Sequence, residues 1–252
     1  MTPSPLSVSL AEYGDAVWRA AELGGTVAVT VSTGHPELDS QLPGGGWPVG
    51  ALSEVLQAQS GQNEWRLLLP ALQRTQSGPV VLVGAPHVPF GPGLAAHGFE
   101  AQRLLWVSAT APAERLWAAE QALRCAPVVA VLAWLPQVRA EQLRRLQIAA
   151  HEYHKLLFVL RPAKAQSESS PAVLRLLVGS APPGASGWVD ALQVQVLKRR
   201  GPPLMKTLAL PARLARLGAL LALKENTVAT ARLWDATDAG GGNALDCFAA
   251  AA

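Results

Sequence analysis

The chain has 252 residues, half of them hydrophobic, and a formal net charge of only +3. Such a chain can bury a sizeable core, so we expect one main domain with a small appendage rather than two equal domains. The near balance of charge permits contact with nucleic acid without requiring it.

Simple counts exclude two further classes. Cys125 and Cys247 lie far apart and form no C-x-x-C pair, so we expect no metal site and no disulfide, and a reducing, cytoplasmic location. Residues 1–10 lack the basic start and apolar stretch of a secretion signal, and the most apolar run, residues 128–135, is too short to span a bilayer. No membrane insertion is expected.

The first fifty residues predict a helix, a short strand and a long loop. Apolar side chains recur at near-helical spacing in residues 6–23, and valines alternate with other residues in residues 27–31. Glycines and prolines punctuate residues 34–50, which predicts a loop. The expected organisation is an N-terminal partner or oligomer arm at 1–31, a core at 32–210, and a helix with a flexible tail at 211–252.

Strands and helices then alternate along the chain. Apolar strands are expected at residues 51–56, 80–83, 104–107, 128–134 and 156–160, and helices at 64–74, after Gly93, at 113–124 and at 139–154. Near-continuous apolar strands are typical of a parallel sheet covered on both faces. Beyond Arg161, strands at 173–178, 192–197 and 205–210 follow one another without helices, which predicts antiparallel pairing. The fold class is therefore α/β, doubly wound, with antiparallel strands at the C-terminal end.

The stretch from Glu54 to Trp65 stands where a strand-loop-helix NTPase carries its phosphate-binding loop. A working loop, G-x-x-x-x-G-K-[ST], supplies backbone N–H groups, a lysine and a hydroxyl group to phosphate and Mg²⁺. The corresponding stretch offers no fixed cation; it contains Gln57, Gly61, Gln62, Asn63 and Glu64. A Glu64 carboxylate about 4 Å from a phosphate oxygen would repel it by roughly 4 kcal/mol at an effective dielectric near 20. We expect a degenerate nucleotide site without a cofactor, in which Ser60–Gly61 forms either a residual anion nest or a plain surface turn.

Residues 32–39, 42–46, 48–50 and 54–55, in this order and spacing, resemble the first part of the ATPase core of the RecA recombinase family. With the elements before and after them, the resemblance covers residues 6–210 and implies a RecA-like P-loop core. Within the family the chain is most similar to the ImuA subgroup, RecA-like accessory proteins of inducible translesion synthesis. SulA-type division inhibitors are somewhat further off.

The resemblance also assigns roles to positions of this chain. The family's catalytic Glu corresponds to Pro86, and the strand that should end in a magnesium-orienting Asp ends in Trp134. The amide that senses the γ-phosphate corresponds to Arg161. Because lysine, base, acid and sensor are all missing, the resemblance implies a pseudo-ATPase.

The function that the resemblance implies is that of a non-catalytic accessory protein in SOS-induced, error-prone translesion DNA synthesis. It would act through contacts with an ImuB-type polymerase homologue, and its further partners would be RecA and an error-prone DnaE-type polymerase. One alternative is a SulA-like inhibitor that binds the division protein FtsZ. Another is a true ATP-dependent recombinase.

Two groups of side chains are candidates for partner contact. The first group consists of cations beside a predicted hairpin turn, namely Lys198, Arg199, Arg200 and Lys206. They would either make weak contact with DNA or an acidic partner, or form a solvated hairpin tip. In the tail, Trp234, Leu245 and Phe248 are candidates for docking to another protein, the alternative being disorder. Residues 162–171 match the family's DNA-binding loop but are short, barely basic and free of aromatic residues, so no autonomous filament on DNA is expected.

The remaining polar and aromatic residues are expected to be structural. Most of the eight tryptophans should lie in the core, with Trp47 and Trp234 as exposed exceptions. Surface or helix-end positions are expected for four histidines, which have no carboxylate or Cys at ligand spacing apart from Glu152 beside the last two; they are His87, His97, His151 and His154. Three arginines are expected on the solvent face of the predicted helix at 139–154; they are Arg139, Arg144 and Arg145.

Overall fold

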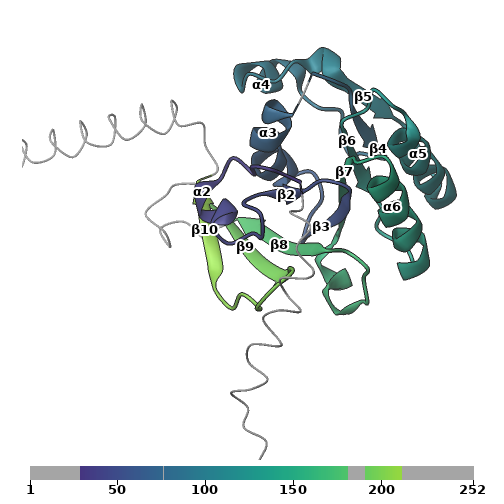
Figure 1. Ribbon diagram of the computed structural model, residues 1–252. Coiled ribbons are helices and arrows are strands. Elements are labelled where there is room, and N and C mark those ends of the chain that lie inside the picture. The colour runs from purple at the N-terminus through teal and green to yellow at the C-terminus, as the bar shows by residue number, and fades with distance from the viewer. Residues whose placement is uncertain (1–28, 76, 181–190, 212–252) are drawn as a thin grey trace, which may run out of the picture. The chain divides into compact units, whose positions relative to one another are not determined.

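A computed structural model describes residues 29–75, 77–180 and 191–211 (Figure 1). The chain divides into two compact units, residues 1–212 and 213–252, and every described residue belongs to the first. The predicted helix at 6–23 and the tail residues Trp234, Leu245 and Phe248 lie outside the described residues.

The core is an eight-stranded mixed sheet with the strand order β10-β9-β8-β3-β7-β6-β4-β5. Its strands are β3 (Ala51–Gln57), β4 (Val80–Val83), β5 (Leu104–Val107), β6 (Ala130–Trp134), β7 (Leu156–Pro162), β8 (Leu174–Ser180), β9 (Ala191–Lys198) and β10 (Thr207–Pro211). The strands from β8 to β5 in this order pair in parallel, whereas β9 pairs antiparallel with β8 and with β10. The predicted α/β class, with a parallel core and an antiparallel C-terminal end, is confirmed.

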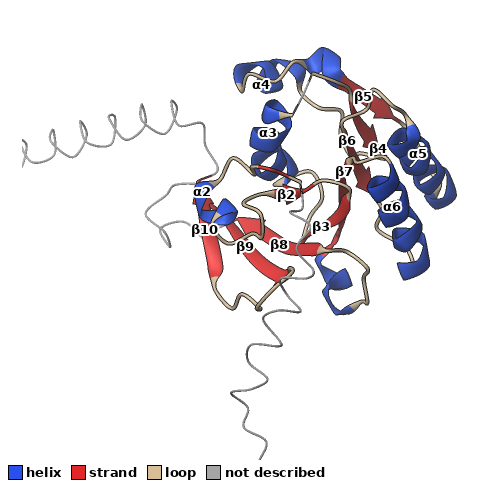
Figure 2. Ribbon diagram, viewed as in Figure 1, coloured by secondary structure: helices blue, strands red, loops and turns tan. Residues whose placement is uncertain are grey.

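Helices cover both faces of this sheet (Figure 2). They are α2 (Pro36–Asp39), α3 (Glu64–Arg74), α4 (Gly91–Ala96), α5 (Pro112–Arg124) and α6 (Ala140–Glu152), with short 3₁₀ turns at Ala101–Arg103 and Ala163–Ser167. Side chains of β7 alternate between the two layers. Phe158 packs in the core shared with α3, whereas Leu157 and Val159 pack in the core shared with α5 and α6. A strand buried on both faces must be apolar at nearly every position, which is the pattern that the sequence shows.

The Gly- and Pro-rich segment at 34–50 is more ordered than the predicted loop. It contains α2 and the two-residue strand β2 (Trp47–Pro48), which pairs antiparallel with β1 (Thr30–Val31). The expectation that Trp47 is exposed is wrong, because its ring is fully buried and packs edge-on against Phe158 with centroids 5.1 Å apart. Its indole contributes to the core instead of offering a contact surface.

Other expectations about aromatic and terminal residues also need correction. Trp106 and Trp117 are exposed, so the tryptophans are less uniformly buried than expected. Pro211 ends β10, and the rest of the helix expected from this residue onward lies outside the described residues. None of the helices in the described part of the chain has the length and apolar content needed to cross a bilayer.

The segment around α2 is built to lie against α3. The Asp39 carboxylate accepts hydrogen bonds from the Ser32 hydroxyl at 2.7 Å and the Thr33 backbone N–H at 2.8 Å, which closes the turn before the helix. Gly34 has φ +83°, and a Cβ there would lie 2.3 Å from Cβ of Pro70 in α3. Only glycine permits this approach, so the segment positions α3 and the loop before it.

Candidate functional site

The loop between β3 and α3 lies at the carboxyl edge of the parallel strands, where open α/β sheets bind their ligands. Strand β3 ends at Gln57, which is buried, and α3 begins at Glu64. Gly61 turns the chain with φ +93°. Asn63 occupies the N-cap position, but its side chain makes no cap hydrogen bond. The helix N-terminus therefore needs another acceptor for its backbone N–H groups.

Glu64 provides that acceptor from within the chain. Its Oε1 accepts hydrogen bonds from the Gly61 backbone N–H at 2.6 Å and from Gln57 Nε2 at 2.5 Å. The indole Nε1 of Trp134 donates to the same oxygen at 3.1 Å, and the Asn63 backbone N–H donates to Oε2 at 3.1 Å. The residue is 1% exposed. Two loop N–H groups and two side chains thus surround one carboxylate.

This arrangement has a clear electrostatic effect. An anion in the first turn of a helix is favoured by the partial positive charge at the N-terminus, and bonds to a charged acceptor are the stronger kind. The Gly61 N–H donates to an anion, as expected for an anion nest at Ser60–Gly61. That anion is the chain's own Glu64 carboxylate. Repulsion between Glu64 and a bound phosphate stays a prediction.

The end of β6 complements this carboxylate. Trp134 stands at the position where the resemblance would require a magnesium-orienting Asp. An indole N–H can only donate a hydrogen bond, so it suits a carboxylate and offers nothing to a metal ion. Gln57 and Trp134 are the last residues of two parallel strands, so both lie at the same edge of the sheet as Glu64. Their positions at predicted strand ends are the sequence signal that could have indicated both as partners of Glu64.

Beyond Gly84, which follows β4, Pro86 and His87 lie against the turn at Gly61. A Cβ on Gly61 would lie 2.6 Å from Cδ2 of His87, so the imidazole lies directly against the turn. His87 is exposed, as are His97, His151 and His154, which confirms their predicted surface positions. In the described ranges no three His, Cys, Asp or Glu side chains gather closely enough to hold a metal ion.

A cavity of about 360 Å³ lies next to the loop, and Arg115 lines it together with Ser60, Pro86 and Trp134. A guanidinium group thus borders the wider region, although the loop stretch itself contains no cation. The guanidinium is held by backbone carbonyl oxygens, because Nε donates to Ala109 at 2.9 Å and one terminal nitrogen donates to Trp134 at 3.3 Å. Arg115 belongs to α5 and comes from outside the loop motif, which is why the loop sequence did not indicate it.

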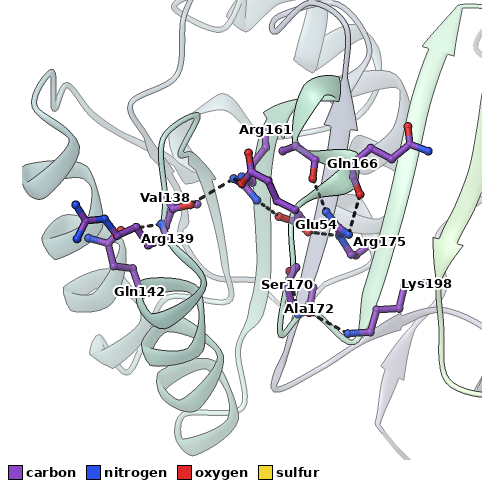
Figure 3. A network of polar contacts seen from close by, with 12 residues as sticks. Glu54, Val138, Arg139, Gln142, Arg161, Gln166, Ser170, Ala172, Arg175 and Lys198 are labelled. Carbon is purple, nitrogen blue, oxygen red and sulfur yellow. Dashed lines mark hydrogen bonds and ion pairs between the residues drawn. The ribbon is translucent and has the colours of Figure 1, made fainter.

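A buried ion network lies in the same sheet, centred on Glu54 in β3 (Figure 3). Glu54 is fully buried; Oε1 accepts from Arg161 of β7 at 2.8 Å, and Oε2 accepts from Nε of Arg175 of β8 at 2.5 Å. Arg161 also pairs with Glu168 at 2.5 Å. Burial by itself would lower the pKa of Arg161, but its hydrogen bonds to Glu54 and Glu168 raise the pKa above its ordinary value. Arg161 therefore stays charged.

This network ties the segment after β7 to the sheet. Arg175 donates to the backbone carbonyl oxygens of Ala165 at 2.9 Å and Gln166 at 3.4 Å. The resemblance assigned Arg161 to a phosphate-sensing position, but its described hydrogen bonds go to Glu54, Glu168 and the Val138 carbonyl oxygen. The sequence carried a signal for this network, because charged residues inside apolar strands usually have buried partners.

The predicted basic cluster lies away from the Glu64 loop, on the β9–β10 hairpin. Lys198 donates to the Ser170 carbonyl oxygen at 3.0 Å, and Arg199 donates to the carbonyl oxygens of Pro202 and Gln41. Arg200 and Lys206 are exposed. The hairpin position is confirmed, whereas contact with DNA or an acidic partner stays a prediction.

The predicted solvent face of α6 is confirmed. Arg139, which precedes the helix, and Arg144 and Arg145 within it are exposed, whereas Leu143 and Leu146 are fully buried. Arg145 pairs with Glu120 of α5 at 2.6 Å across the surface.

No protein-family model matches the chain. The proteins named Protein ImuA from Caulobacter vibrioides strains NA1000 / CB15N and ATCC 19089 / CIP 103742 / CB 15 are each 34% identical to it over 165 residues. The aligned region is 62% of this chain and 66% of each relative, just under two thirds of their length. Over this region the chain is similar to Protein ImuA.

Proposed function

We propose that the chain is a non-catalytic, RecA-like accessory protein of error-prone translesion DNA synthesis in the cytoplasm. It acts by binding an ImuB-type polymerase homologue, and RecA and a DnaE-type polymerase are further partners. The relation to ImuA supports this pathway. The SulA-like alternative receives no support from the relatives found.

The fold supports a RecA-like core. A parallel sheet carries a strand-loop-helix unit, β3 to α3, in its interior between β7 and β8. A loop of this kind at the carboxyl edge of an inner strand is where P-loop proteins hold phosphate.

The occupation of that loop by Glu64 is the observation that carries the non-catalytic part of the proposal. A triphosphate that used the Gly61 N–H would have to displace the carboxylate, which accepts four hydrogen bonds. Hydrogen bonds to a charged group contribute about 1.5–3 kcal/mol each, so losing even half of them weakens nucleotide binding by about a hundredfold or more. Binding of partners, not turnover, is the role that remains.

Co-purification tests this proposal. The full chain carries an affinity tag and is isolated from DNA-damaged cells of its source, once with added Mg·ATP and once after nucleotide removal. We expect the ImuB-type homologue to be recovered equally in both samples, with no DNA-stimulated ATP hydrolysis. Recovery only with Mg·ATP, or recovery of FtsZ in place of the polymerase homologue, would contradict the proposal.

A further inference from the structure

A second pocket opens at the opposite edge of the sheet from the Glu64 loop. It has a volume of about 180 Å³ and lies where β3 and β8 begin, beside α6 and the β9–β10 hairpin. Strand β3 separates it from the loop by about 20 Å, given a rise of about 3.3 Å per residue. The two sites therefore lie apart from each other.

The walls of this pocket combine apolar and cationic groups. The residues that line it include Leu42, Pro43, Pro48, Val49 and Val173 on the apolar side and Arg199, Arg200 and His151 on the polar side. No Asp or Glu side chain is among its lining residues. An acidic group that enters would meet positive charge that no lining carboxylate offsets.

The two arginines differ in a way that suits ligand binding. Arg199 is fixed, because Nε donates to the Pro202 carbonyl oxygen at 2.8 Å and a terminal nitrogen donates to that of Gln41. Arg200 is exposed, and in the described ranges no hydrogen bond or ion pair engages its guanidinium. A fixed cation gives orientation without further loss of side-chain entropy, and an unengaged one can close on the ligand.

The backbone around the pocket is held in place without a ligand. Gln147 of α6 accepts a hydrogen bond from the Leu52 backbone N–H at 2.6 Å and donates to the Gly50 carbonyl oxygen at 3.5 Å. A Cβ on Gly46 would lie 2.2 Å from the Val31 carbonyl oxygen, so the segment before β3 packs closely on β1. A preformed pocket binds with a smaller ordering cost.

We propose that this pocket binds an acidic peptide segment of a partner protein. An aliphatic side chain of the peptide fills the apolar part, and a neighbouring carboxylate pairs with Arg199 and Arg200. A nucleic acid fits less well, because the lining has no Phe, Tyr or Trp on which a base could stack and only two arginines to bind phosphate. This inference goes beyond the proposed function, since it depends neither on nucleotide nor on the polymerase partner.

Fluorescence anisotropy of the full chain tests the inference with defined probes. The first probe is a fluorescein-labelled peptide in which two leucines alternate with aspartates and glutamates. The other two probes are the same peptide with its leucines replaced by glycine, and a thymidine oligonucleotide. We expect saturable, salt-sensitive binding of the first probe, and at least severalfold weaker binding of the other two.

The variant Arg200→Gln tests whether the acidic leucine peptide binds in this pocket. The residue is exposed, so the substitution should leave the melting temperature nearly unchanged. We expect the substitution to lower the affinity for the first probe about fivefold, which corresponds to the loss of one ion pair of about 1 kcal/mol. The matched control is Arg144→Gln, an exposed arginine on α6 outside the pocket lining, which should leave the affinity unchanged.

Three results would overturn the inference. One is no saturable binding of the acidic leucine peptide, and another is an equal loss of affinity in both variants. The third is that the oligonucleotide binds more tightly than the peptide and that Arg200→Gln weakens this binding. That result would assign the pocket to nucleic acid.

Discussion

Replacing Glu54 by Gln should be one of the most destabilising single changes in the described sheet. The substitution keeps the shape of the side chain but removes its charge, and it leaves Arg161 and Arg175 without the carboxylate that both contact. Arg161 is 2% exposed and Arg175 is 8% exposed, so solvent cannot replace the lost partner. Removing one partner of a buried ion pair costs about 3–5 kcal/mol. With a typical total of about 5–15 kcal/mol, much of the stability would disappear.

The matched control is Glu168→Gln. Its carboxylate binds the same arginine, but the side chain is 51% exposed, and exposed pairs contribute at most about 1 kcal/mol. Urea unfolding of both variants, monitored by circular dichroism with the m-value checked for constancy, measures the difference. A Glu54→Gln cost no larger than that of Glu168→Gln would refute the reasoning.

Three further changes test other parts of the account. Trp134→Phe removes one donor to Glu64 and should lower the free energy of unfolding by about 1 kcal/mol, as measured by urea unfolding. Trp47→Ala should cost about 3–5 kcal/mol in the same measurement because the indole is buried, whereas Trp117→Ala, at an exposed site, should stay within about 0.5 kcal/mol; equal effects would contradict the assigned burial. Burial lowers the pKa of His35, so the unfolded chain binds more protons as the pH falls below about 6.5 and stability should decrease there. In melting curves between pH 7 and 5, His35→Asn should lose part of that decrease, and an unchanged slope would show that His35 does not cause it.

Local periodicity was sufficient to predict most of the elements. The helix Glu64–Arg74 and the strands Val80–Val83 and Leu104–Val107 have the predicted bounds, because each has a clear apolar pattern and ends at a turn or a change of pattern. The segment at 34–50 differs from its prediction because it has no clear local pattern of apolar residues. Its glycines and prolines predict a loop, but its order comes from tertiary contacts such as Trp47 with Phe158, which no local pattern reveals.

The candidate site could be predicted only in part. The loop sequence identified Glu64 as the unusual residue, and the structure adds that its carboxylate accepts hydrogen bonds from the loop N–H groups. Trp134 was not identified as a partner because it lies 70 positions away in the sequence. Glu54 lies 107 and 121 positions from Arg161 and Arg175 in the sequence. Contacts between residues so far apart in the sequence depend on which strands become neighbours. The local pattern of a single segment does not determine the strand order.

Titration calorimetry of Mg·ATP into the purified full chain tests the central claim that the Glu64 carboxylate has taken the place of a nucleotide phosphate. We expect no saturable heat at concentrations where P-loop ATPases bind the nucleotide. Arg115→Gln, which alters the neighbouring cavity, should change nothing. Tight, saturable binding of Mg·ATP, and above all binding that Arg115→Gln abolishes, would contradict the account.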